Sequence, residues 1–323
     1  MKNIIICCDG TGNEYCDHNT NVVELYSVAV KCSKQITFYD PGVGTGGWEY
    51  EEESGLLKAK RDQATGDGLQ KNVEDAYRFL MRYYEEGDRV FLFGFSRGAF
   101  TVRALGGMLY KVGLLRNDND NLWEYASKIC NSQENKYSDG IVTGFRSTFC
   151  RPCPAYFIGV WDTVESLVLN GKRFYNHQLN PETKFGYHAL AIDEKRKDFP
   201  PCLWDETQKT AGQTIEQVWF AGVHSDVGGW YDERGLSNTA LLWMIEKARA
   251  CGMEVDMDRA AVYKSNPHDA IHESYDGFWL FRGKEARAIP SGALIHTSAV
   301  ERMEKAANGY KPQNLPANFA TVS

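Results

Sequence analysis

The chain has 323 residues, which allows one domain or two, and we expect a single α/β domain over residues 1–323. Its 43% hydrophobic and 24% charged residues are ordinary for a globular protein and exclude a disordered, collagen-like or coiled-coil chain. The formal net charge of −7 offers no bulk basic field for nucleic acid, so we exclude a nucleic-acid partner.

The first apolar run ends at Asp9, which is too short for a signal-peptide core, and no stretch reaches the roughly 18 apolar residues of a membrane span. We therefore expect a cytoplasmic protein, or one exported by a system that needs no signal peptide. The nine cysteines are then expected to be structural thiols. Cys150 and Cys153 form one CxxC pair, but a metal or redox role is less favoured because no second pair accompanies it.

Short apolar runs alternate with segments of helical period, which predicts a mostly parallel central sheet flanked by helices. The predicted strands are 4–8, 36–39, 90–95, 156–160 and 217–223. The predicted helices are 21–31, 68–84, 97–110, 187–197 and 237–250. We expect loop insertions at 42–68 and 165–185 and a helical cap or lid at 113–150, and the segment after Gly252 shows little clear period.

The most informative segment is Gly94-Phe95-Ser96-Arg97-Gly98, which follows an apolar strand and precedes a helical segment. In this Gly-x-Ser-x-Gly pattern the glycines let strand and helix approach closely around a serine held in a strained turn. The turn projects the hydroxyl above the sheet, beside the N-terminus of the following helix. We expect Ser96 to be a nucleophile. The alternative is a packing turn of a nucleotide-binding unit, but the phosphate-binding motifs are absent here.

A serine nucleophile needs a base, and the base needs a carboxylate that orients it. Asp162 comes just past the fourth predicted strand, and His224 comes directly after the fifth. Because the carboxyl ends of parallel strands meet at one edge of a sheet, both side chains are expected to converge on Ser96. His296 also ends a short apolar run and is the alternative base. Asp226, close to His224, is the alternative acid.

An acyl oxyanion needs hydrogen-bond donors near the nucleophile. The Arg97 N–H, at the start of the helix, is one candidate. The loop after the first strand supplies Gly10 and Thr11 as further candidates for this oxyanion hole. The alternative is that Asp9 and Asn13 of this loop merely cap a turn.

Aspartates follow several predicted strands, and carboxylates gathered at one edge of a sheet are a pattern that can hold magnesium. Repeated Gly-Asp turns produce the same set without a metal. We therefore expect neither a metal nor a cofactor. The aspartates concerned are Asp9, Asp40, Asp162 and Asp226.

Several longer motifs follow one another across nearly the whole chain: CDGTGN, FGFSRGAF, GVWDTV, HALAIDEKR and VWFAGVHSDVGG. In this order they resemble the uncharacterised alpha/beta-hydrolase domain family that includes the first class of type VI secretion lipase effectors. The resemblance implies an α/β-hydrolase-like fold and a Ser-Asp-His hydrolase with Ser96, Asp162 and His224 at the motif positions. Characterised relatives of this kind cleave phospholipid acyl esters.

The expected function is therefore a serine hydrolase of carboxylic esters with a lipase- or phospholipase-type activity. It is expected to work through an acyl-enzyme intermediate and to act on an ester or lipid. Those effectors carry further membrane-contacting segments, whereas this chain ends at Ser323, so peripheral membrane contact stays open. The alternatives are an esterase or thioesterase for small soluble esters and a catalytically silent binding module. The oligomeric state is left open.

Overall fold

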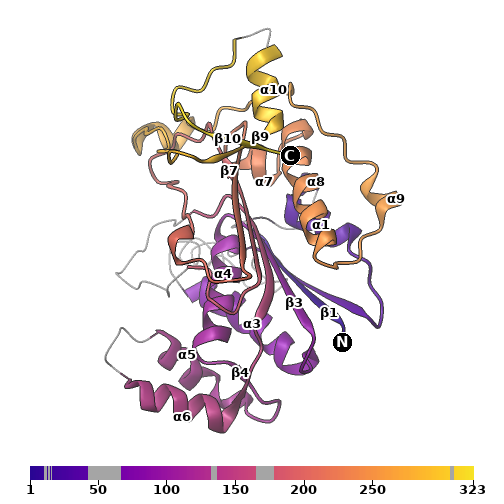
Figure 1. Cartoon of the computed structure of the whole chain (residues 1–323), viewed down its shortest axis with the longest axis vertical. Helices are drawn as coiled ribbons and strands as arrows, with labels where there is room; N and C mark the ends of the chain where they lie inside the picture. Colours follow the sequence, from indigo (N-terminus) through magenta and orange to yellow (C-terminus); the bar gives the residue numbers. More distant parts are fainter. Residues whose placement is uncertain are drawn as a thin grey trace, which may run out of the picture.

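The structure is a computed structural model that describes residues 1–10, 13, 15, 17–42, 67–131, 137–164, 178–305 and 309–323. Within these residues eight strands form one sheet in the order β10-β9-β8-β7-β6-β3-β1-β2, and every neighbouring pair is parallel (Figure 1). The strands of this sheet are β1 Asn3–Cys8, β2 Gln35–Asp40, β3 Arg89–Phe95, β6 Ala155–Trp161, β7 Phe185–Ala191, β8 Thr214–Phe220, β9 Leu294–His296 and β10 Ala320–Val322.

Strand β1 illustrates why the sheet lies in the middle of the protein. Side chains alternate between the two faces of a strand, and here both faces are apolar and buried, as expected for a central parallel strand. Ile4 and Ile6 pack in a cluster with α3 and α4, whereas Ile5 and Cys7 pack in another with α1 and α8. The sheet is therefore the middle layer of three (Figure 1).

The helices agree with the predicted ones at four positions: α1, α3, α4 and α8. Shorter elements cap the sheet ends or join them. The helices are α1 Asn21–Val28, α3 Asp67–Tyr83, α4 Arg97–Lys111, α5 Trp123–Asn131, α6 Asp139–Phe149, α7 His224–Gly228, α8 Gly235–Ala250, α9 Met257–Ala260 and α10 Thr297–Lys305, with 3-10 turns η1 Asp120–Leu122, η2 Glu206–Gln208 and η3 Gly277–Phe281.

The order of the strands reverses beside β1. The chain passes from β1 to β2 on one side, then crosses to β3 on the other side and continues outward to β10. In open parallel sheets this switch point leaves a crevice at the carboxyl ends of the strands, where ligands bind. Gly10, shortly after β1, and Ser96, directly after β3, lie at this point.

One predicted helix is wrong, because residues 187–197 contribute a strand. β7 runs over Phe185–Ala191 between β6 and β8 and is buried along almost its whole length. A strand buried on both faces shows no alternation of polar and apolar residues, so a short apolar run of this kind can mimic a helical period. His188, within β7, is fully buried, and burial lowers its pKa to about 3.

The described residues of the segment 113–150 are mostly helical, and their helix α6 contacts the end of α4 away from Ser96. Arg146 of α6 donates to the carbonyl of Tyr110, in the last turn of α4. Ser96 precedes the first turn of that helix, so α6 contacts the far end of an element about 20 Å long. Figure 1 likewise draws α5 and α6 at the end of the molecule away from α7. The short antiparallel pair of β4 Leu114–Leu115 and β5 Cys150–Arg151 closes this unit.

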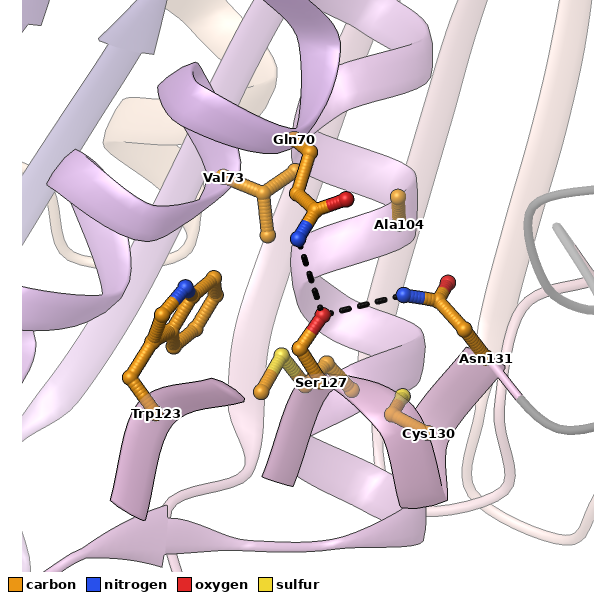
Figure 2. Close-up of a pocket in the computed structure, with 8 residues that line it drawn as sticks. Gln70, Val73, Ala104, Trp123, Ser127, Cys130 and Asn131 are labelled. Carbon is orange, nitrogen blue, oxygen red and sulfur yellow. Dashed lines mark hydrogen bonds between the residues drawn. The ribbon is translucent and has the colours of Figure 1, made fainter. Parts of the chain in front are cut away.

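A small cavity lies between α3, α4 and α5 (Figure 2). Its volume of about 20 Å³ has room for about one water molecule. Ser127 Oγ accepts hydrogen bonds there from Gln70 Nε2 at 3.3 Å and Asn131 Nδ2 at 3.0 Å. The cavity is therefore a packing feature of this helical unit.

The segment after α8 adds the outer strands β9 and β10 and the helix α10, none of which the sequence pattern predicted. Ile289, Ile295 and Ala299 pack there against Leu190 and Trp219. None of the helices in the described part of the chain combines the length and hydropathy that a bilayer span requires. The described residues also contain no group of three or more histidine, cysteine or acidic side chains arranged to hold a metal ion.

Candidate active site

Ser96 lies in a strained turn between β3 and α4. Its φ of 56° and ψ of −120° fall in a region that a residue with a side chain rarely adopts. The turn is crowded, because a Cβ on Gly98 would overlap the carbonyl oxygens of Cys8 and Asp9. The strained backbone predicted for this serine is therefore confirmed, and the close approach explains the glycine that follows it.

Asp162, directly after β6, also has a positive φ, of 40°. Its side chain is fully buried. Oδ1 accepts hydrogen bonds from the Ala191 N–H at 3.0 Å and from Arg287 Nη1 at 2.5 Å. Oδ2 accepts from Arg287 Nη2 at 2.8 Å and lies 2.5 Å from Nδ1 of His224. Both carboxylate oxygens are thus satisfied, and the orientation of the carboxylate is fixed.

His224 joins Asp162 to Ser96. Its Nδ1 faces Asp162 Oδ2, and its Nε2 lies 2.9 Å from Ser96 Oγ. An ionised carboxylate only accepts hydrogen bonds, so Nδ1 carries the proton and Nε2 is free to accept the serine hydroxyl proton. Phe95 and Phe199 pack on the imidazole with ring centroids 4.6 and 5.1 Å away. The structure therefore brings the three predicted side chains into one hydrogen-bonded chain.

The charges around this chain are paired. Burial acts to raise the pKa of Asp162, but the charge of Arg287 and the hydrogen bonds from His224 and Arg287 outweigh it and hold that pKa well below its usual range. Glu194 is a second buried carboxylate, and its Oε2 accepts the His224 N–H at 3.2 Å. Burial raises its pKa too, but hydrogen bonds and charge from Arg196 lower the pKa to about 2. Both acids are therefore ionised at neutral pH.

The three predicted oxyanion donors, Arg97, Gly10 and Thr11, differ in their positions and contacts. Arg97 is the first residue of α4, so its N–H belongs to the N-terminal turn of the helix directly after Ser96. A Cβ on Gly10 would lie 3.4 Å from the Ser96 Cβ, so this loop borders the site. The Gly10 N–H, however, donates to Asp9 Oδ1 at 2.7 Å, so it is already engaged. Thr11 lies outside the described residues.

The side chains of the alternative base and acid contact partners other than Ser96. His296 stacks on Phe220 at 4.5 Å, and its Nδ1 accepts the Ser298 N–H at 3.2 Å. Burial lowers the pKa of His296 to about 4. Asp226 accepts the Val223 N–H at 2.9 Å, and its Oδ1 lies 2.6 Å from Nδ1 of His272. These contacts favour a role for Asp226 in holding the loop that carries the base.

A pair of alanine variants separates the two histidines. His224→Ala is expected to lower kcat for ester hydrolysis by at least about 10³-fold, because the base and its link to Asp162 are lost. His296→Ala should keep kcat within about threefold. The measurement is the steady-state rate on a p-nitrophenyl ester for each purified variant. Equal losses in both variants would contradict the assignment of the base.

Two charged residues of the site were not among the predicted ones, Arg287 and Glu194. Glu194 lies in the HALAIDEKR motif, and that motif was the one available signal for it. Arg287 contacts Asp162 across 125 positions of sequence and belongs to the segment that shows no clear period. No local pattern indicates such a contact.

The lowered pKa of Glu194 predicts how the free energy of unfolding depends on pH. Its pKa is lowered from 4.5 to about 2, so its contribution is fully present above pH 4.5 and is lost as pH falls through 2. At pH 7 this contribution amounts to about 3 kcal/mol. Glu194→Gln is expected to lower the free energy of unfolding at pH 7, by an amount that shrinks by about 1 kcal/mol at pH 3.5.

Urea unfolding followed by tryptophan fluorescence at the two pH values measures this difference. Glu304→Gln, which alters an exposed acid of α10, is the matched control and should change little at either pH. A Glu194→Gln deficit that is the same at pH 7 and pH 3.5 would contradict the ionised, paired state of Glu194.

The comparisons with known proteins place the chain in a family. Residues 2–247 match the family described as T6SS, Phospholipase effector Tle1-like, catalytic domain. The chain belongs to this family. The part that matches the Tle1-like catalytic domain includes Ser96, Asp162 and His224, and it ends before Arg287.

Three further proteins are similar to this Tle1-like chain. Uncharacterized protein YEL023C of Saccharomyces cerevisiae is 33% identical over 220 residues, 61% of this chain and 32% of the yeast protein. An uncharacterized protein from Pseudomonas aeruginosa aligns with a TM-score of 0.46 at 17% identity, over 83% of this chain and 49% of that one. The Tle1 effector bound to the VgrG spike from the Type 6 secretion system aligns with a TM-score of 0.44 at 18% identity, over 72% of this chain and 51% of that chain. The chain thus spans a third to a half of these proteins.

Proposed function

We propose that this chain is a serine hydrolase that cleaves carboxylic esters, with acyl esters of lipids as its substrate class. The observation that carries the proposal is the hydrogen-bonded chain from Ser96 Oγ through His224 to Asp162, built on a strained serine at the start of a helix. Membership of the Tle1-like family, whose description is that of a phospholipase effector, supports the same class of reaction.

In the first half of the reaction Ser96 Oγ attacks the acyl carbonyl carbon while His224 Nε2 takes the hydroxyl proton. The Arg97 N–H at the start of α4 donates to the oxyanion, and the partial positive charge of the helix N-terminus favours it. Asp162 holds the Nδ1 proton and stabilises the imidazolium that forms. His224 then gives its proton to the leaving alcohol as the ester C–O bond breaks, which leaves an acyl-serine.

In the second half water replaces the alcohol. His224 Nε2 takes a proton from the water as its oxygen attacks the acyl carbon, and the oxyanion is bound in the same place. The proton returns to Ser96 Oγ when the acyl bond to the serine breaks, and the carboxylic acid leaves. The residues of the chain supply every proton transfer in this sequence, so no cofactor is invoked.

The surroundings of His224 support an apolar acyl group. Phe199 contacts the imidazole, and the Trp279 ring centroid of η3 lies 5.1 Å from that of Phe199. Two further apolar side chains of η3 face solvent, with Leu280 56% and Phe281 88% exposed. Exposed apolar side chains on the short helix that carries Trp279 suit a substrate that is itself apolar.

The experiment is a substrate series for the purified chain. Fatty acid released from phospholipid vesicles is measured beside the rates on p-nitrophenyl esters of two to sixteen carbons. We expect kcat/KM to rise with acyl length and vesicles to release fatty acid. A preference for the shortest esters with inert vesicles would replace the lipid substrate with a small soluble ester. Absence of hydrolysis on every substrate by the folded protein would contradict the proposed function and favour a binding module.

A further inference from the structure

The carboxylate of Asp162 has a buried counter-charge that belongs to a distant part of the chain. The Arg287 side chain is 3% exposed and that of Asp162 is fully buried. The two Nη atoms of Arg287 reach the two carboxylate oxygens separately, at 2.5 and 2.8 Å. This two-point pairing fixes both the position and the rotation of the carboxylate, because a planar guanidinium matches a planar carboxylate in one orientation.

Arg287 is itself held in place from two sides. Its Nη1 donates to the carbonyl of Ala191, the last residue of β7, and its Nη2 donates to the Phe199 carbonyl, each at 3.0 Å. Its own carbonyl accepts a hydrogen bond from Asn314 Nδ2 at 3.2 Å, and Asn314 also donates to the Ile192 carbonyl at 3.0 Å. The guanidinium is thus fixed between the end of β7 and the last segment of the chain.

We infer that Arg287 is a positioning residue of the proposed hydrolase: it keeps Asp162 ionised and holds Oδ2 toward His224 Nδ1. The inference rests on the proposed function, and it extends the catalytic unit beyond residue 247, where the match to the Tle1-like family ends. Both Arg287 and His224 bond to the carboxylate of Asp162, so Arg287 acts on the imidazole through that carboxylate.

The electrostatic consequence has a definite sign. A buried carboxylate without a counter-charge takes up a proton more easily. Arg287 makes the acid a neutral ion pair, and its charge holds the pKa of Asp162 below the usual range, so that Asp162 stays ionised as the pH falls. Removing the cation should therefore move the acidic limb of the activity profile toward higher pH.

The test compares Arg287→Gln and Arg287→Lys in the full chain with Arg259→Gln. Arg259 is an exposed arginine of α9 that pairs with Asp256 and serves as the matched control. The readouts are kcat, KM and the pH profile on a p-nitrophenyl ester, each normalised to sites titrated with a fluorophosphonate. A proton NMR spectrum of histidine-labelled protein adds the downfield signal of the Nδ1 proton that His224 shares with Asp162.

For Arg287→Gln we expect kcat to fall by about 10²-fold with KM within twofold, and the acidic limb to rise by about one pH unit. Arg287→Lys keeps the charge, so its limb should stay near that of the unaltered protein while kcat recovers only in part. The Nδ1 signal should shift or broaden in Arg287→Gln and stay unchanged in Arg259→Gln. If Arg287→Gln does not fold, Arg287→Lys carries the test, because its acidic limb should stay in place while its kcat is lowered.

An unshifted limb and an unchanged Nδ1 signal in a folded Arg287→Gln protein would overturn the inference while leaving the proposed function intact. So would a loss of activity that disappears when rates are expressed per titrated site. If the unaltered protein neither hydrolyses esters nor reacts with the fluorophosphonate, the proposed function fails instead. The NMR signal then still decides whether Arg287 orients Asp162 toward His224.

Discussion

Ser96→Ala is expected to abolish ester hydrolysis and to leave the fold unchanged. The substitution removes one oxygen atom, the one that lies 2.9 Å from His224 Nε2, and creates no cavity of consequence. In serine hydrolases the loss of the nucleophile lowers kcat by about 10⁶-fold, and the remaining rate comes from binding and the oxyanion donors. The measurement is kcat on the best ester of the substrate series, together with the melting temperature.

Ser127→Ala is the control, because this serine bonds to Gln70 and Asn131 in the cavity between α3, α4 and α5. It should keep full activity. A second variant, Ser96→Gly, separates function from strain. It should be as inactive as Ser96→Ala but melt at a higher temperature, because glycine adopts the φ of 56° without the penalty a side chain brings. Hydrolysis by Ser96→Ala within tenfold of the unaltered rate would contradict the mechanism.

Asp162→Asn is expected to have the second largest effect, a loss of about 10⁴-fold in kcat. The asparagine side chain has one oxygen that accepts and one amino group that donates, whereas both oxygens of Asp162 accept. The imidazole of His224 is therefore no longer held with its proton on Nδ1. Unlike Ser96→Ala, this change should also destabilise the protein, because it leaves the buried Arg287 cation without its partner. Breaking one side of a buried ion pair costs about 3–5 kcal/mol. Steady-state kinetics and urea unfolding measure the two effects.

Asp226→Asn is the matched control. Asp226 bonds to Val223 and His272 rather than to the ring of His224, so this variant should retain kcat within about tenfold. An Asp226→Asn loss larger than that of Asp162→Asn would exchange the roles of the two acids. Equal stability of Asp162→Asn and the unaltered protein would show that Arg287 needs no partner.

The positions of Ser96, Asp162 and His224 could be predicted because each follows an apolar run with a local signature. Parallel strands bring such ends together whatever their separation in sequence, and 62 and 128 positions separate the bonded pairs here. The structure brings these side chains together although one of the predicted elements is wrong. β7 was expected to be a helix, yet it inserts between β6 and β8 without moving either strand end away from the common edge.

The contribution of Arg287 could not be predicted in the same way. Its function depends on one long-range contact with Asp162, and neither period nor motif marks the segment in which it lies. The placement of the helices within the cap or lid expected at 113–150 could not be predicted for a related reason. Helical period predicts α5 and α6, but the end of the sheet on which they pack follows from the direction of α4, whose last turn lies at the amino ends of the strands.

The central claim is that Ser96 is an activated nucleophile. The direct measurement is reaction of the folded chain with a fluorophosphonate, followed by mass spectrometry of the peptide that carries the phosphonyl group. The account predicts one adduct per chain on Ser96, with none in Ser96→Ala and strongly slowed labelling in His224→Ala. A folded protein that stays unlabelled, or an adduct that persists in Ser96→Ala, would contradict it.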